Sequence, residues 1–420
     1  MEPDSFSAGN TIVAATQSGR FFDGGASNIQ FATSTDGGAN WTDGGLPGLT
    51  VHGPNPGPFD RASDPVVAFS AKHNVWMIGS LGINEGTEAR PDNAPLSLEA
   101  QQTPAAVVVN RSTDGGTTWG NPVTVAQSGN FPDKNWTACD NWPGSPFFGN
   151  CYTEYDENGL GNRIKMSTST NGGLTWGAPL NTANTGTGLG GMPVSQPNGT
   201  VVVPIGSANL GAIQVFRSIN GGASWGATST ITQVQAHTVA GNIRAGAILS
   251  ADVDASGRIY VVWHDCRFRT NCSSNDLVMT TSTDGVNWTP VVRIPIDPVD
   301  SGRDHFIPGL AVDHGTSGNT AHVAASFYYY PDAACSGDGC ELHAGFVEST
   351  DGGQTWSGKI ELNGTMRPSW IADTSQGRMV GDYISTSFVN GKAWPVYSFA
   401  AAPSGATFVQ STFAAKLSGN

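Results

Sequence analysis

The sequence predicts an all-β fold built from a repeated unit, because one octapeptide recurs six times along the 420-residue chain. Five copies follow the pattern Ser-X-Asp/Asn-Gly-Gly-X-X-Trp, and the sixth is one residue shorter. Each copy follows a short run of apolar and β-branched residues, as at positions 344–347, which is typical of a strand. The 55 Gly and 12 Trp suit many short strands joined by tight turns. The copies begin at Ser34, Ser112, Ser169, Ser218, Ser282 and Ser349.

Each octapeptide is expected to form the turn that ends a strand. In the last copy, Asp351 can accept hydrogen bonds from nearby backbone N–H groups, and Gly352 and Gly353 supply the positive φ that such a turn needs. Trp356 then covers the turn with a large apolar ring. The octapeptides resemble the Asp box of bacterial sialidases and related β-propellers. In that superfamily the boxes lie on the face opposite the active site, so the resemblance implies architecture more than chemistry.

Strand-like segments precede every octapeptide. Residues 247–253 and 259–263, for example, come before the octapeptide strand at 277–281. The tail, from 369 to 414, repeats the strand pattern without an octapeptide. Six boxed units and one unboxed unit predict a seven-bladed β-propeller of four-stranded antiparallel blades, with six Asp-box turns, in a single domain over residues 1–420. Alternatively, the N-terminal segment could pair with the tail and share a blade.

The composition excludes several classes of partner. A formal net charge of −14 argues against nucleic acid and anionic membranes, both of which need a basic surface. No apolar run of about 18 residues is present, so no membrane-spanning helix is expected. An acidic substrate would therefore have to meet a local cluster of Arg or His. The acidic surface also serves the solubility of a secreted protein.

The six cysteines fall into three close pairs, which we expect to be disulfides that staple loops in an oxidising compartment. None has the spacing of a zinc site. Seven Asn-X-Ser/Thr triplets agree with secretion. Met1 is followed directly by Glu-Pro-Asp, so we expect a mature secreted form with an added Met. The expected pairs are Cys139 with Cys151, Cys266 with Cys272, and Cys335 with Cys340.

The loops opposite the octapeptide turns are the expected place for a binding site. In a propeller these are the loops that lead into each innermost strand and the loops that join the second and third strands. Many of the chain's 20 Lys and Arg fall in them, which predicts an anion-binding pocket. The long polar insertion at 82–104 belongs to the same face. The predicted substrate-binding residues are Arg20, Arg61, Lys134, Trp136, Arg267, Arg367 and Tyr383.

The sequence Trp-His-Asp-Cys-Arg around His264 is the most informative local cluster. His264 ends a buried strand, and a disulfide would hold the following loop rigid, which suits a positioned acid or base. Arg303 and His305 enter the next innermost strand. Any one of the histidines could instead be a hydrogen-bonded structural residue. The predicted catalytic residues are His237, Arg244, His264, Arg303, His305 and Tyr330.

Seven-bladed propellers that cleave uronic-acid glycans are known among polysaccharide lyases, including exo-acting rhamnose-glucuronate lyases, and the chain is similar to these in size and predicted blade count. The resemblance implies that Arg or His neutralises the uronate carboxylate, while His or Tyr removes the C5 proton. No cofactor is required for this chemistry. We therefore predict a secreted, monomeric enzyme that cleaves an acidic, uronate-containing glycan by β-elimination, with rhamnosyl-glucuronate ends as one candidate substrate.

Two other functions stay open. A sialidase-like glycoside hydrolase would use paired carboxylates such as Asp64 with Glu85 or Asp265. Sialidases carry an F/Y-R-I-P motif before the first box, whereas the nearest match here, at 292–295, follows the fifth. A non-catalytic glycan- or protein-binding propeller would show a pocket lined by aromatic residues without paired His and Arg. Asp252 and Asp254, in a tight turn, could bind a structural calcium ion through oxygen ligands, although such a pair is usually only a turn.

Overall fold

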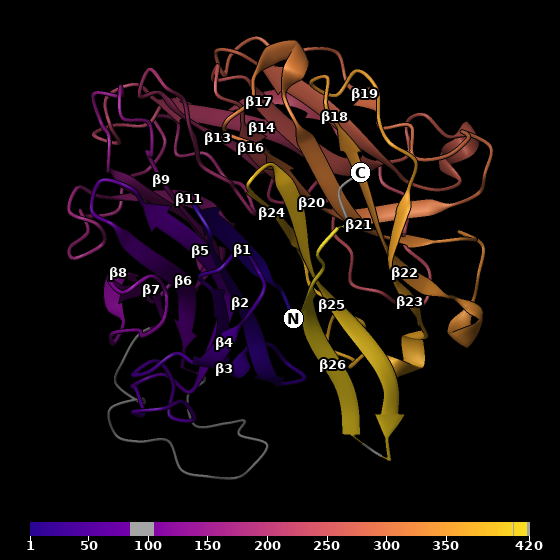
Figure 1. Cartoon of the computed structure of the whole chain (residues 1–420), viewed down its shortest axis with the longest axis horizontal. Coiled ribbons are helices and arrows are strands. Elements are labelled where there is room, and N and C mark those ends of the chain that lie inside the picture. The colour runs from indigo at the N-terminus through magenta and orange to yellow at the C-terminus, as the bar shows by residue number, and fades with distance from the viewer. Residues whose placement is uncertain (85–104, 406, 418–420) are drawn as a thin grey trace.

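The computed structural model describes residues 1–84, 105–405 and 407–417. The described chain forms antiparallel sheets that stand around a central axis, and the chain passes from one sheet to the next in sequence order (Figure 1). The fold is an all-β propeller, as predicted. Nowhere in the described part of the chain is there a helix that could cross a membrane.

The first sheet contains two four-stranded units that are joined by the single residue pair Ala26 and Ala62. Its strands are β1 (Asp4–Ala8), β2 (Thr11–Arg20), β3 (Ala26–Ser34), β4 (Thr42–Gly45), β5 (Arg61–Ser70), β6 (Val75–Ile83), β7 (Ala106–Ser112) and β8 (Val123–Gln127).

Three further sheets have four strands each, and two have three. The four-stranded sheets are β12 (Val194–Ser195), β13 (Val201–Gly206), β14 (Ala212–Ser218) and β15 (Ser229–Gln233); β16 (Ser250–Val253), β17 (Ile259–Asp265), β18 (Asp276–Ser282) and β19 (Val292–Arg293); and β20 (Asp304–Val312), β21 (Val323–Tyr330), β22 (Leu342–Ser349) and β23 (Ile360–Met366). The three-stranded sheets are β9 (Pro132–Cys139), β10 (Cys151–Glu157) and β11 (Arg163–Ser169), and β24 (Ser385–Val389), β25 (Lys392–Ser404) and β26 (Thr407–Ala414). Short 3₁₀ helices lie at η2 (Asn158–Leu160), η3 (Thr270–Cys272), η4 (Gly318–Thr320), η5 (Gly337–Gly339) and η6 (Pro368–Trp370).

The predicted count of seven four-stranded blades is therefore wrong, because the described residues form five four-stranded units. Beside β11, the chain makes only isolated bridges, such as Met166 with Leu180. After β26 only three more residues are described, and no further strand follows among them.

The first and last sheets close the ring through side chains. Strand β24 contacts both β20 and β1, and the innermost strands β1, β5, β9, β12, β16 and β20 contact one another in chain order. Ser5 Oγ lies 3.1 Å from Ser385 Oγ and 2.7 Å from Ser387 Oγ. The N-terminal segment pairs with β2 and not with the tail, so no blade is shared between the two ends of the chain.

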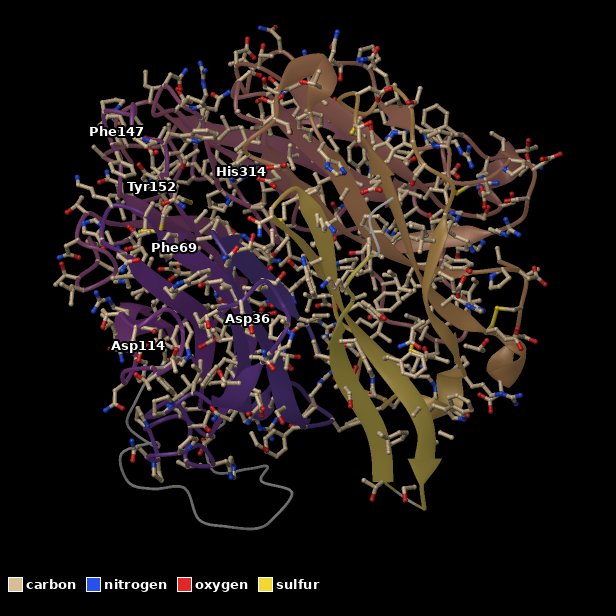
Figure 2. All side chains as sticks on the ribbon, in the orientation of Figure 1. Asp36, Phe69, Asp114, Phe147, Tyr152 and His314 are labelled. Atoms are coloured by element: carbon tan, nitrogen blue, oxygen red, sulfur yellow. A yellow bond between two sulfur atoms is a disulfide. The ribbon has the colours of Figure 1, made fainter. Side chains whose placement is uncertain are left out.

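The octapeptide turns make the expected hydrogen bonds. In the last copy, the N–H groups of Gln354 and Thr355 donate to Asp351 Oδ1 at 2.9 and 2.8 Å. The Ser349 hydroxyl accepts from Gly353 N at 2.9 Å. Equivalent bonds form at the other five positions, which are Asp36, Asp114, Asn171, Asn220 and Asp284. Asp36 and Asp114 are labelled in Figure 2, on the first two units.

In every turn one glycine packs against the preceding unit: the second glycine in five copies, and Gly285, the single glycine, in the shorter copy. A Cβ atom at Gly38, where φ is +83°, would lie 2.2 Å from Trp394 Cη2 of the last sheet. The turn therefore needs glycine both for its backbone conformation and for the close approach. The corresponding close neighbours are Val13 for Gly116, Met77 for Gly173, Tyr152 and Thr168 for Gly222, Val202 for Gly285, and Met279 for Gly353.

All three predicted disulfides are present. Cys139 and Cys151 face each other across β9 and β10. The Cys266–Cys272 bridge closes the loop between β17 and β18, and the Cys335–Cys340 bridge closes the loop between β21 and β22. Their presence fits an oxidising compartment.

The two glycines of the first turn provide a matched test of this packing. Gly38→Ala should lower the melting temperature more than Gly37→Ala, because the nearest atom to a Cβ at Gly37 is 4.0 Å away, whereas Trp394 blocks a Cβ at Gly38. Both positions have positive φ, so backbone strain is common to the two variants. Overpacking should cost Gly38→Ala about 1–3 kcal/mol more. Equal melting temperatures by circular dichroism would contradict this role of Gly38.

Candidate functional site

A cavity of about 550 Å³ lies at the central axis, at the end of the propeller where the innermost strands begin. Charged side chains dominate its wall, and the exposed rings of Phe22 and Phe131 lie at its rim. Its volume falls in the range of about 300–1,000 Å³ that is usual for ligand pockets. The charged lining residues are Glu2, Arg20, Asp23, Asp64, Asp133, Lys134 and Arg244.

Three of these residues occupy corresponding positions in consecutive units. Glu2, Asp64 and Lys134 lie at the starts of β1, β5 and β9, and their φ angles are +51°, +47° and +46°. The ladders of β5 and β9 are irregular at these points, with register shifts between Ser63 and Val66 and beside Lys134. A bulge of this kind redirects a side chain. Here the bulges accompany three charged side chains that converge on the axis.

Lys134 is the centre of a buried ion cluster. Its Nζ lies 3.3 Å from Glu2 Oε1, 3.0 Å from Asp64 Oδ1 and 2.6 Å from Asp382 Oδ2. Arg244 also pairs with Asp382. The Lys134 side chain is 8% exposed and its three partners are at most 4% exposed. Since the three carboxylates come from different units of the propeller, the cluster joins the first, second and last units to the third.

The cluster separates the pKa values of its carboxyl groups. Burial, together with the nearby Asp64 carboxylate, raises the pKa of Glu2 to about 7. Burial alone would also raise the pKa of Asp382, but Lys134 and Arg244 lower it to about 2. The same carboxylates outweigh burial and raise the pKa of Lys134. Near neutral pH the cavity thus presents a Glu2 that can donate a proton beside a firmly charged ammonium group.

Three cationic side chains line this cavity, and Arg20 is the one that has no carboxylate partner among the described residues. Its Nη1 contacts Met379 Sδ, and its buried Nε has no hydrogen-bond partner in the described chain. An unpaired, partly buried guanidinium is costly unless an anion reaches it. Its donors form a planar fork that suits a carboxylate or sulfate group.

Below the cavity floor, two acidic side chains of β10 are fully buried. Neither carboxyl oxygen of Asp156 has a hydrogen-bond partner among the described residues, and Glu154 accepts one bond, from Gly191 N at 3.2 Å. Burial and the neighbouring Asp133 raise the pKa of Asp156 to about 9. Burial also raises the pKa of Glu154 well above its ordinary value. Both groups are therefore protonated at neutral pH.

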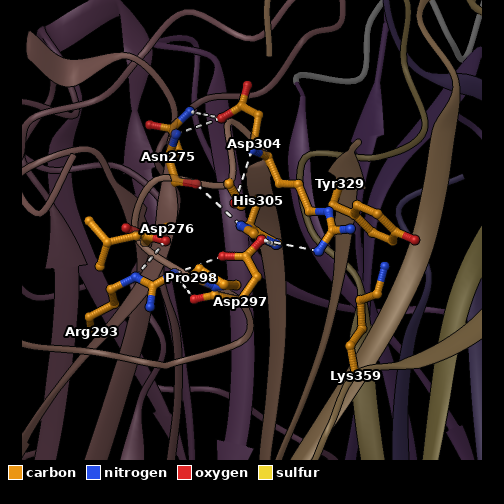
Figure 3. Close-up of polar contacts among 12 residues, drawn as sticks. Asn275, Asp276, Arg293, Asp297, Pro298, Asp304, His305, Tyr329 and Lys359 are labelled. Atoms are coloured by element: carbon orange, nitrogen blue, oxygen red, sulfur yellow. Dashed lines mark hydrogen bonds and ion pairs between the residues drawn. The ribbon is translucent and has the colours of Figure 1, made fainter. Parts of the chain in front are cut away.

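A second polar cluster lies between the sheets of β16–β19 and β20–β23 (Figure 3). Asp297 accepts from Arg269 at 3.0 Å and from Arg293 at 2.7 Å, and its other oxygen is 3.4 Å from His305 Nε2. Burial lowers the pKa of His305 to about 4, so this ring is neutral. The cluster fastens the segment before β20 to the loop closed by the Cys266–Cys272 disulfide.

The spacing of this cluster would admit a metal ion, but its charges are already balanced. Ligand atoms of Asp276, Asp297 and His305 lie within 4.8 Å of one another. Arg269 and Arg293, however, both pair with Asp276 and with Asp297. A cation added there would meet two guanidinium groups. The arrangement therefore suits a structural ion-pair network.

The predicted site residues fall into separate groups. Arg20, Lys134 and Arg244 come together at the central cavity. His237 and Arg303 join His305 in the second cluster, where His237 Nδ1 is 3.6 Å from Asp304 and Arg303 Nη1 is 4.0 Å from Asp297. The predicted single mouth that combines these histidines with the cationic residues is not formed.

The other predicted catalytic residues lie in the core. His264 is fully buried, and neither ring nitrogen has a hydrogen-bond partner in the described structure. Burial lowers the pKa of His264 to about 4. Tyr330 is also fully buried, and its hydroxyl has no partner among the described residues. Neither side chain lines the central cavity.

The remaining predicted binding residues are held by neighbours. Arg61 is buried and donates to Asp23 at 2.6 Å, which places it behind the cavity wall. Tyr383 donates to Pro65 O at 2.8 Å and packs edge-on against Trp136.

On the outer loops, Arg267 pairs with Asp265 at 2.7 Å, and Arg367 is exposed beside Trp370. In the turn considered for calcium, Asp252 pairs with His314 at 2.8 Å and Asp254 accepts from Ser256 N at 2.9 Å. Glu85 and most of the insertion at 82–104 lie outside the described residues.

Sequence reasoning missed Glu2, Asp133 and Asp382 as site residues. One available signal is that Glu2 and Asp64 each precede a proline at the start of an innermost strand. Asp382 lies in a Gly-Asp-Tyr segment whose tyrosine drew attention instead.

No protein-family model and no curated protein matches the chain. Among solved structures, a leech intramolecular trans-sialidase complexed with 2,7-anhydro-Neu5Ac is similar with a TM-score of 0.51 and 13% identity, over 86% of this chain and 67% of that one. A PL25 ulvan lyase, also solved bound to -[GlcA(1-4)Rha3S]-, is similar with a TM-score of 0.51 and 11% identity, over 94% and 88% of the two chains. At such low identities, the structural similarity shows a shared fold and no more.

The buried Asp156 predicts a specific pH dependence of stability. Its folded pKa of about 9 lies above its ordinary value, so between about pH 4 and pH 9 the folded state keeps a proton that the unfolded state has released. The free energy of unfolding should therefore fall with rising pH, by about 1.4 kcal/mol per pH unit for this one group. Asp156→Asn should be more stable than the wild type, by a margin that grows between pH 5 and pH 8.

The exposed Asp43 provides the control, since Asp43→Asn should leave this slope unchanged. Urea unfolding followed at several pH values measures both variants. If Asp156→Asn and the wild type lose stability equally between pH 5 and pH 8, Asp156 is not a buried protonated group.

Proposed function

We propose that the protein is a secreted enzyme that cleaves an acidic glycan in the central cavity. The observation that carries this proposal is Arg20, a cavity-lining guanidinium with no carboxylate partner among the described residues. It is placed to bind a carboxylate or sulfate group of the substrate. The disulfides and the Asn-X-Ser/Thr triplets support secretion.

The carboxyl groups around Lys134 supply the chemistry in this proposal. Glu2, whose pKa is raised to about 7, donates a proton to the leaving glycosidic oxygen. Asp64 contacts the same ammonium group and lines the same cavity, and burial raises its pKa, which makes its carboxylate a stronger base for the activation of water. Lys134 stabilises negative charge on the base before the reaction and on the reacting groups during it.

Hydrolysis fits the cavity better than the β-elimination predicted from the sequence. That mechanism uses His or Tyr as the base, and neither residue type is found among the described residues that line the cavity. Lys134 is held in its charged form and is unsuited to remove a proton. Elimination stays a second candidate because Arg20 would neutralise a uronate carboxylate in either mechanism.

A non-catalytic glycan-binding function is the third candidate. Phe22 and Phe131 are 61% and 44% exposed at the cavity rim, where they could stack on sugar rings. The cavity also lacks a His–Arg pair among its described lining residues. Binding of an acidic glycan without release of any product would favour this function.

Substitution of Arg20 tests the proposed anion contact. A panel of uronate-containing and sialylated oligosaccharides is incubated with the protein, and reducing ends, free sialic acid and the ultraviolet absorbance of unsaturated uronate are followed. On the substrate that is cleaved, Arg20→Gln should raise KM about 10–100-fold, since a hydrogen-bonded ion pair contributes about 1.5–3 kcal/mol. Arg367→Gln, an exposed arginine outside the cavity, should leave KM unchanged.

Glu2→Gln is the companion variant and should lower kcat while folding normally, because the amide cannot donate the proton. Release of reducing ends without unsaturated product indicates hydrolysis, and a rise in absorbance indicates elimination. An Arg20→Gln variant with unchanged KM would remove this cavity as the acidic-glycan site.

A further inference from the structure

A second cavity, of about 380 Å³, lies at the other end of the central channel. Its wall comes from later positions of the same innermost strands, such as Phe6 of β1 and Phe69 of β5. We call it the lower cavity, and the central cavity lined by Glu2, Asp64 and Lys134 the upper cavity. Since β1 and β3 run in the same direction, the lower cavity is at the end of the propeller where the octapeptide turns lie.

Aromatic rings form one side of the lower cavity, and Trp142 is held in a fixed position there. Its Nε1 donates to Ser195 O at 2.6 Å, and its N–H donates to Asp140 Oδ1 at 3.1 Å. The same Asp140 carboxylate accepts from Ser145 Oγ. The loop that carries Trp142 lies between the two cysteines of the Cys139–Cys151 disulfide. The indole is therefore preorganised as a flat apolar surface.

Polar groups lie beside Trp142, whose ring contacts the His314 ring with the centroids 5.9 Å apart. Asp252 Oδ1 pairs with His314 Nε2 at 2.8 Å, and Asp252 Oδ2 accepts from Val312 N at 2.7 Å. Ser195 is 6% exposed, lines the cavity, and its hydroxyl has no hydrogen-bond partner among the described residues. The His314 side chain is 44% exposed, so the cavity reaches the surface beside it; Phe69 and His314 are labelled in Figure 2.

The lining chemistry indicates a neutral ligand. No Lys or Arg is found among the described residues that line this cavity, while Asp4 and Asp252 are. Asp252 is paired with His314, so the described lining offers no unpaired cation to an anionic sugar, in contrast to the cavity that contains Arg20. A pyranose ring offers an apolar C–H face for the aromatic rings and hydroxyl groups for Ser195 and Asp252.

We propose that the lower cavity is a second carbohydrate site, which binds one neutral pyranose unit in contact with Trp142, Ser195 and the Asp252–His314 pair. This site does not depend on catalysis in the upper cavity. It would allow the protein to hold a neutral part of a glycan on one face while an acidic part occupies the other face, or to attach to a neutral glycan surface.

Isothermal titration calorimetry with the methyl glycosides of glucose, galactose and mannose, and with cellobiose and lactose, tests the proposal. At least one of these sugars should bind with a saturable heat. Trp142→Ala and Asp252→Asn should each weaken that binding at least about tenfold. Arg20→Gln should leave it unchanged, which separates this site from the proposed active cavity. Thermal melts establish that each variant is folded. If Trp142→Ala does not fold, the binding measured for Asp252→Asn alone tests the proposal.

Three results would overturn the proposal. The first is the absence of saturable binding for all five sugars. The second is binding that survives both Trp142→Ala and Asp252→Asn in folded protein. The third is binding that is lost in Arg20→Gln, which would place the sugar in the upper cavity.

Discussion

The ammonium group of Lys134 is the interaction on which both the ring and the proposed site depend. It holds three buried carboxylates that come from the first, second and last units of the propeller. Removing the positive charge would leave Asp64 buried without an ion-pair partner among the described residues, and Asp382 with Arg244 alone, which is far more costly than losing an exposed ion pair. The same charge, together with Arg244, keeps Asp382 ionised, whereas burial and the nearby Asp64 raise the pKa of Glu2 to about 7. The residues that close the ring are therefore the same residues to which we assign the proposed acid and base.

At the opposite end of the propeller, neighbouring units contact each other through the glycines of the octapeptide turns and not through ion pairs. Each turn packs one glycine against the preceding unit, and Gly38 packs against Trp394, where the last unit meets the first. The two ends of the channel therefore differ in character. Charged groups converge where the innermost strands begin, whereas aromatic and small residues surround the channel where those strands end.

The sequence was informative wherever the determinants are local. The octapeptide turns and the three disulfides could be predicted because their residues are neighbours in the chain, and the convergence of Arg20 with Arg244 followed from the propeller topology. The sequence pattern around His264 suggested a catalytic base, but a local pattern does not show that the ring is buried without a polar partner. The pairing of Glu2 with Lys134 depends on distant segments and backbone bulges, which carry little sequence signal. The number of outer strands was overestimated, because beside β11 the chain forms only isolated bridges.

A crystal structure of the Glu2→Gln variant with an acidic oligosaccharide tests the central claim most directly, since this variant should bind substrate without cleaving it. The account predicts a sugar in the upper cavity, with its carboxylate or sulfate within about 3 Å of the Arg20 guanidinium and a glycosidic oxygen beside residue 2. An oligosaccharide bound instead at the exposed Arg303, or a cavity that stays empty at saturating concentration, would contradict it.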